Sequence, residues 1–180
     1  MLRSFVVGVL GLALLLCAVS INAGSAKAAD DFGQLLVGAG QYDIIPNDNK
    51  SGAVYAQYRF GWGFGEGWLG QNFMGIKPLV GGFLNTDSGH FAFVGFAAPF
   101  SWGKNDMWQF EPSAGIGLYH QGDSTFLGGK EQFHVGFQGS VRVITGVRAG
   151  MGLTHVSNAT LLHKKNRGTN ILMGTVGLEF

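Results

Sequence analysis

Apolar and polar side chains alternate along much of this chain, and this period of two limits the possible folds more than any other feature. In the clearest stretch, Phe133, Val135 and Phe137 alternate with His134 and Gly136. Successive side chains of a β-strand point to opposite faces, so the pattern indicates strands with one apolar face. The chain is therefore predicted to be all-β.

Eight stretches of about ten residues are rich in Val, Phe, Tyr, Ile and Gly and are separated by turn-rich segments. They are Gly33–Tyr42, Gly52–Trp62, Phe73–Leu84, His90–Phe100, Trp108–Tyr119, Gln132–Ile144, Val147–Ala159 and Asn170–Phe180. A tilted strand needs about ten residues to cross the hydrocarbon of a bilayer. The lengths fit eight antiparallel membrane-spanning strands.

The N-terminus has the features of a secretory signal peptide. Arg3 precedes the apolar stretch Phe5–Ile21, and Ala26-Lys27-Ala28 matches a cleavage pattern. We expect residues 1–28 to be removed and residues 29–180 to form the barrel domain, with an uncleaved anchor helix as the alternative. The one cysteine lies within the apolar stretch, so the mature chain would contain no disulfide.

Export, an even strand number and the terminal Phe180 favour an outer-membrane β-barrel over a soluble sandwich. An unpaired strand edge is not tolerated in hydrocarbon, so the sheet must close. Only 13% of the residues are charged, about half the usual share, and the net charge of +1 gives no reason to expect a nucleic-acid partner. The polar faces would line a plugged interior without an open pore, filled by Arg59, Lys77, Glu111, Gln138, Arg142 and Glu179.

His155 and Ser157 are the most informative polar residues, because they lie two positions apart on a predicted strand and so share one face. They have the parity of Met151 and Leu153, which places them on the lipid-facing side. A polar pair is costly there, and a histidine beside a serine is the base and nucleophile of acyl transfer. A tight last hairpin would bring Asn170 close to His155. The alternative is a strand end that dips into lipid headgroups.

The last thirty residues resemble a known family of outer-membrane esterases. His155–Ala159 reads H-V-S-N-A, Asn166–Gly168 reads N-R-G, and a strand with an aromatic end follows. This pattern is similar to that of the lipid A 3-O-deacylase (PagL-type) family. The resemblance implies an eight-stranded outer-membrane barrel that removes an ester-linked acyl chain from the lipid A of lipopolysaccharide. Its partners would be lipid A and the lipids of the outer membrane.

The resemblance also implies roles for individual residues. Ser157 would be the nucleophile, His155 the general base and Asn158 an oxyanion donor, with Asn166 and Gly168 in support. The active site would face the outer leaflet.

The family usually has a glutamate just after N-x-G, and Asn170 stands there instead. Asn170 can orient His155 by a hydrogen bond but stabilises an imidazolium less than a carboxylate does. We therefore expect either lower activity than in a glutamate-bearing relative or a need for another acid.

Lys164, Lys165 and Arg167 form a basic cluster in the same connection, and either contact lipid A phosphates or are simply solvated. No cluster of residues has the spacing of a metal site and no glycine-rich loop joins a strand to a helix, so we expect no metal and no cofactor. The rival to an esterase is a non-catalytic structural or surface-exposed barrel. A solute channel is disfavoured by the charged interior.

Overall fold

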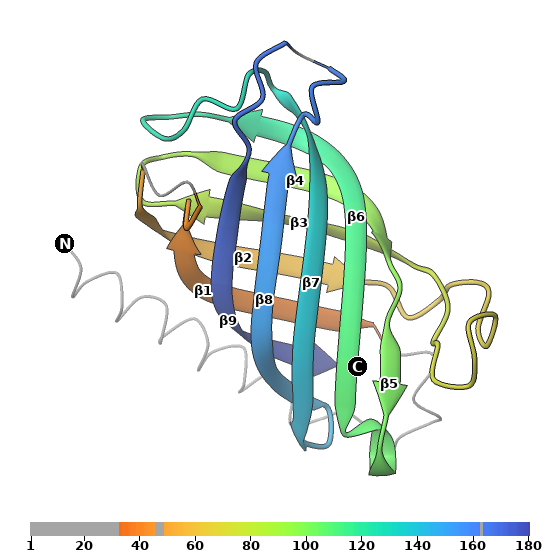
Figure 1. Cartoon of the computed structure of the whole chain (residues 1–180). Coiled ribbons are helices and arrows are strands. Elements are labelled where there is room, and N and C mark those ends of the chain that lie inside the picture. The colour runs from red at the N-terminus through yellow and green to blue at the C-terminus, as the bar shows by residue number, and fades with distance from the viewer. Residues whose placement is uncertain (1–32, 46–48, 163) are drawn as a thin grey trace.

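The computed structural model describes residues 33–45, 49–162 and 164–180, which form an antiparallel β-barrel (Figure 1). The predicted signal peptide and its cleavage point lie outside the described residues.

No helix in the described part of the chain is long and apolar enough to span a membrane.

Each strand pairs antiparallel with its neighbours, and the pairings of β1 with β9 and of β4 with β6 close the sheet. The strands are β1 Gln34–Tyr42, β2 Ser51–Arg59, β3 Lys77–Asn85, β4 His90–Ala97, β5 Phe100–Trp102, β6 Trp108–His120, β7 Glu131–Ile144, β8 Val147–Ser157 and β9 Thr169–Glu179. The short β5 pairs with β6 directly beyond β4, so it continues the same strand position. The predicted eight-stranded barrel is therefore confirmed.

Three predicted strands extended too far. The stretch 90–100 is broken into β4 and β5 at Pro99, which has no N–H to donate to the sheet. β2 ends at Arg59 and β3 begins only at Lys77. The connection between them has six glycines between residues 61 and 75. Four of these, Gly65 among them, have positive φ, which ends an extended strand.

The interior is filled by side chains. The half of the lumen near the β8–β9 connection contains an aromatic cluster that includes Tyr42, Phe83, Phe91 and Tyr119. The other half contains ion pairs. Arg59 Nε lies 3.0 Å from Glu111 Oε2, and the Glu179 carboxylate forms ion pairs with Arg142 at 2.6 Å and with Arg148 at 2.7 Å. An interior cavity of about 20 Å³ has room for about one water molecule. The prediction of a plugged interior is confirmed.

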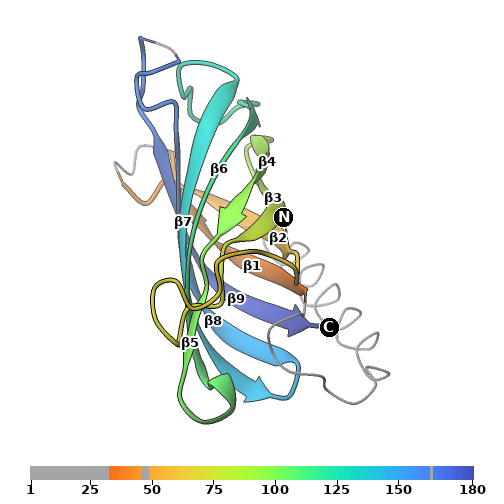
Figure 2. The ribbon, with the colours of Figure 1, turned by 90° about the vertical axis from the view of Figure 1, so that its right-hand side faces the viewer.

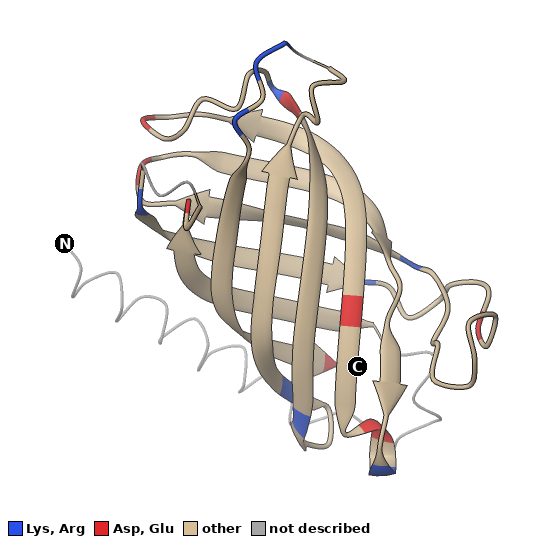
Figure 3. Ribbon diagram, in the orientation of Figure 1, with Lys and Arg blue, Asp and Glu red and all other residues tan. Residues whose placement is uncertain are grey.

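The outer wall is apolar and exposed between two more polar ends. Figure 3 shows Lys, Arg, Asp and Glu gathered mainly in the loops and near the strand ends, with few along the wall itself. Outward side chains such as Val94, Phe137 and Met151 are 59%, 48% and 61% exposed. This surface is what a barrel presents to lipid.

The two ends of the barrel differ. At one end, the β6–β7 and β8–β9 connections extend beyond the rest of the barrel (Figure 2). We call this the loop end, and it also contains the β1–β2 and β3–β4 connections. The opposite end, which contains the short Thr145–Gly146 turn and the β5–β6 connection, is the turn end.

Candidate active site

His155 and Ser157 are the last outward-facing residues of β8, at the loop end. Met151 and Leu153 precede them on the same face and are 61% and 39% exposed. The structure thus places the pair on the outside of the barrel wall, as its parity predicts. β9 brings Asn170 directly opposite His155 in the register.

The three side chains form one chain of hydrogen bonds. His155 Nε2 lies 3.0 Å from Ser157 Oγ, and His155 Nδ1 lies 2.9 Å from Asn170 Oδ1. An amide oxygen can only accept, so Nδ1 carries the proton and Nε2 presents its lone pair to the serine hydroxyl. This is the tautomer that a general base needs. The arrangement can take a proton from Ser157 and activate its oxygen.

Gly168 covers the pair from the side of the loop. Its φ is +68°, and a Cβ added there would lie 2.9 Å from His155 Cε1 and 3.4 Å from Ser157 Cβ. Both the backbone conformation and the space therefore require glycine. The predicted supporting residue thus packs against His155 and Ser157 and helps to bury Ser157, which is 8% exposed.

The side-chain amide of Asn158, the expected oxyanion donor, is occupied by hydrogen bonds within the protein. Its side chain is fully buried, and Nδ2 donates to the backbone carbonyls of Leu127 at 2.9 Å and Lys165 at 2.7 Å. Its Oδ1 accepts from the backbone N–H of Thr160 at 2.8 Å. Because both amide hydrogens are occupied, the side chain has no donor left for an oxyanion. Asn158 instead joins the β6–β7 and β8–β9 connections.

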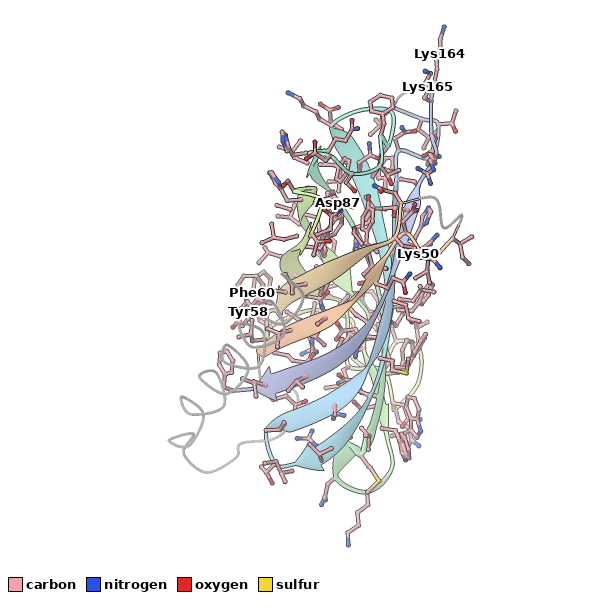
Figure 4. The ribbon with its side chains drawn as sticks, turned by 90° about the vertical axis from the view of Figure 1, so that its left-hand side faces the viewer. Lys50, Tyr58, Phe60, Asp87, Lys164 and Lys165 are labelled. Atoms are coloured by element: carbon pink, nitrogen blue, oxygen red, sulfur yellow. The ribbon has the colours of Figure 1, made fainter. Side chains whose placement is uncertain are left out.

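The predicted basic cluster divides into two parts. Lys164 and Lys165 project from the tip of the β8–β9 connection, away from the barrel (Figure 4). Arg167 instead points to the β1–β2 connection, where its Nη2 lies 3.0 Å from Asp43 Oδ2. Arg167 is thus part of the loop framework, and the two lysines are the cations that point outward.

Sequence reasoning missed two contributors from the β1–β2 connection. Asp43 is fully buried beside Arg167, and the backbone oxygen of Ile45 accepts a hydrogen bond of 2.9 Å from Asn170 Nδ2. Nothing local in the sequence predicts these contacts, because a backbone carbonyl has no sequence signature and Asp43 resembles any turn residue. Among the described residues, no group of three His, Cys, Asp or Glu side chains is placed to hold a metal ion.

Comparison with solved structures identifies similar barrels. A crystal structure of the outer membrane enzyme PagL matches with a TM-score of 0.64 at 12% sequence identity, covering 80% of this chain and 98% of that one. Neisserial surface protein A matches with a TM-score of 0.54 at 13% identity, covering 86% of this chain and all of that one. No curated protein sequence matches. At these identities the structural matches establish the fold.

The family follows from the sequence match. The model of the family described as lipid A 3-O-deacylase (PagL) matches residues 50–179, which include β2 to β9 and every predicted site residue. The match thus spans well over half of the 180 residues. This chain therefore belongs to the lipid A 3-O-deacylase (PagL) family and is an ester hydrolase of the outer membrane.

Proposed function

We propose that this chain hydrolyses the 3-O-linked acyl ester of lipid A with Ser157 as nucleophile and His155 as general base. The observation that supports this most directly is the continuous hydrogen-bonded series from Asn170 through His155 to Ser157. A serine hydrolase site has the same parts on any fold: an acceptor that orients an imidazole, and a hydroxyl that the imidazole activates.

The reaction proceeds in two acyl transfers. Ser157 Oγ attacks the ester carbonyl while its proton passes to His155 Nε2, and the imidazolium then protonates the departing sugar hydroxyl. Water attacks the resulting acyl-serine, and its proton passes to the same nitrogen. The free fatty acid leaves and the serine hydroxyl is restored.

The substrate's acyl chain would lie on the outer wall below Ser157. Leu153 and Leu172, next along β8 and β9, are 39% and 41% exposed, and Val135 and Phe137 of β7 are 40% and 48% exposed. A fatty acyl chain on this wall keeps the environment that it has in the membrane. We place the loop end at the outer leaflet, where lipid A resides and where a site on the outer wall meets it directly.

The oxyanion needs a donor other than the side chain of Asn158. Asn166 is the second amide residue of the motif, and its side chain is exposed two residues before Gly168. We assign the donor to Asn166, where an aimed hydrogen bond is worth about 3–4 kcal/mol to the transition state. The exposed Lys164 and Lys165 would meet the phosphates of lipid A.

Expression in a bacterium of known lipid A structure, followed by mass spectrometry, tests the proposal. The wild-type chain should remove one hydroxyacyl chain, whereas Ser157→Ala and His155→Gln should leave lipid A intact. His120→Gln is the matched control, since His120 is exposed at the loop end of β6. If the folded wild-type barrel left lipid A unaltered, the result would contradict the proposal and favour a non-catalytic structural or surface-exposed barrel.

A further inference from the structure

The amide of Asn170 is held in one orientation by the β1–β2 connection. Its Nδ2 donates to the backbone oxygen of Ile45, while its Oδ1 faces His155 Nδ1. A backbone oxygen can only accept hydrogen bonds, so it selects the NH₂ group and turns the amide oxygen toward the imidazole.

The orientation of this side chain matters because Asn170, the partner of His155 Nδ1, is an amide and not a carboxylate. A carboxylate has two acceptor oxygens and would bond the Nδ1 proton in either orientation. A flipped asparagine would instead present its NH₂ group to Nδ1 and favour the opposite tautomer, with the proton on Nε2. Nε2 could then no longer accept the Ser157 proton. A site with Asn170 in this place therefore needs a group that prevents the flip.

Asp43 ties the same connection to both neighbours of Gly168. Its Oδ2 lies 3.0 Å from Arg167 Nη2, and its Oδ1 accepts a hydrogen bond of 3.3 Å from Thr169 Oγ1. Asp43 follows β1 directly, is fully buried and has a φ of +56°. Since Gly168 packs against the His155 ring, the carboxylate fixes the turn that covers the imidazole.

A backbone hydrogen bond completes the contact. The N–H of Ile44 donates to the backbone oxygen of Asn170 at 3.3 Å. Residues 43–45 therefore form hydrogen bonds or ion pairs with residues 167, 169 and 170. These contacts join the start of the chain's barrel to its last hairpin, where β1 and β9 are neighbours. They surround the site without contributing a reacting atom.

We propose that the 43–45 segment is a positioning element, in which Asp43 holds the Gly168 turn against the imidazole and the Ile45 carbonyl keeps His155 protonated on Nδ1. This inference rests on the proposed function of His155 and Ser157. In this chain the segment supplies the orientation that a carboxylate in place of Asn170 would not require.

Imidazole ¹⁵N NMR on the full mature chain, folded in detergent micelles, reads the tautomer directly, with the His155 signals identified by their loss in His155→Gln. The wild type should show the Nδ1-protonated form. Asp43→Asn keeps the side-chain size but turns a donor toward Arg167 or Thr169. It should mix the two tautomers and lower kcat about tenfold with little change in KM. Asp123→Asn, a change at an exposed loop-end carboxylate, is the control and should alter neither.

A folded Asp43→Asn barrel with wild-type tautomer and kcat would overturn the inference. If Asp43→Asn does not fold, Thr169→Val removes one of the same bonds and serves in its place. A wild type without esterase activity would refute the proposed function, while the tautomer comparison would still test the positioning. A further check introduces Asp43→Asn into the Asn170→Asp variant. The loss of kcat caused by Asp43→Asn should be smaller in this background than in the wild type, and an equal loss would contradict a role through the amide.

Discussion

Replacement of Asn170 by aspartate should raise the turnover of this enzyme. The two side chains have the same shape, so an aspartate oxygen would take the place of Oδ1, 2.9 Å from His155 Nδ1. The hydrogen bond then becomes charge-assisted, and the carboxylate faces the imidazolium that forms when Ser157 gives up its proton.

The expected gain follows from the distance. A carboxylate and an imidazolium about 4 Å apart attract by about 4 kcal/mol at an effective dielectric constant of about 20. Asn170 and His155 are only half-buried, so water screens part of this attraction. A net gain of about 1.4–2.7 kcal/mol in the transition state corresponds to about 10- to 100-fold in kcat.

The substitution also has a cost. Aspartate cannot donate to the Ile45 oxygen, and a second carboxylate oxygen would face that carbonyl. Because this hydrogen bond is exposed, water can replace it, and the loss of folding stability should be about 1 kcal/mol.

The assay is acyl release from lipid A in mixed micelles, with kcat and KM measured separately for the wild type, Asn170→Asp, Asn170→Glu and Asn170→Leu. Asn170→Leu should lower kcat about tenfold, since it removes the acceptor for the Nδ1 proton. Asn170→Glu restores the usual acid of the family and should also raise turnover. No gain in either acidic variant would refute the reasoning that the neutral amide limits the rate.

Three further predictions concern the surroundings of the site. Gly168→Ala should reduce kcat more than tenfold in a folded barrel, because its Cβ would lie 2.9 Å from the His155 ring, and heat-modified gel mobility checks the folding. Glu179→Gln should cost about 3–5 kcal/mol in urea unfolding from vesicles, since it leaves two interior arginines without their carboxylate. Lys164→Ala with Lys165→Ala should raise KM for phosphorylated lipid A at low salt and leave KM for a neutral ester unchanged, whereas an equal change for both substrates would exclude phosphate contact.

The barrel was largely predictable because its signal is local. Strand parity depends only on the order of neighbouring residues, so the outward placement of His155 and the inward placement of Arg59 both follow from alternation. Strand ends were less predictable. Trp62 and Phe73 favour sheets, so the sequence predicts strand at both ends of the 60–76 connection, and only the backbone conformation shows the glycine turns between them.

Asn158 shows the limit of reasoning from a motif. The family resemblance implies that it is an oxyanion donor, but the strand ends at Ser157 and the chain turns at Ala159, where φ is +53°. The turn directs the amide to carbonyls of two connections and so to a structural role. A motif specifies neighbours along the chain, whereas the direction of a side chain after a strand end depends on the turn.

The sequence by itself determined the polar and apolar faces of the strands and an outward-facing histidine and serine on the penultimate strand, since each follows from a period of two. Eight stretches of membrane-spanning length indicated a closed barrel, because an unpaired strand edge is not tolerated in hydrocarbon. Only the tertiary structure decided what holds the histidine. The Ile45 oxygen lies 125 residues from Asn170 along the chain, and Asp43 lies 124 residues from Arg167. They meet because closure of the sheet makes the first and last strands neighbours, and no local pattern encodes a contact that exists only once the barrel has closed.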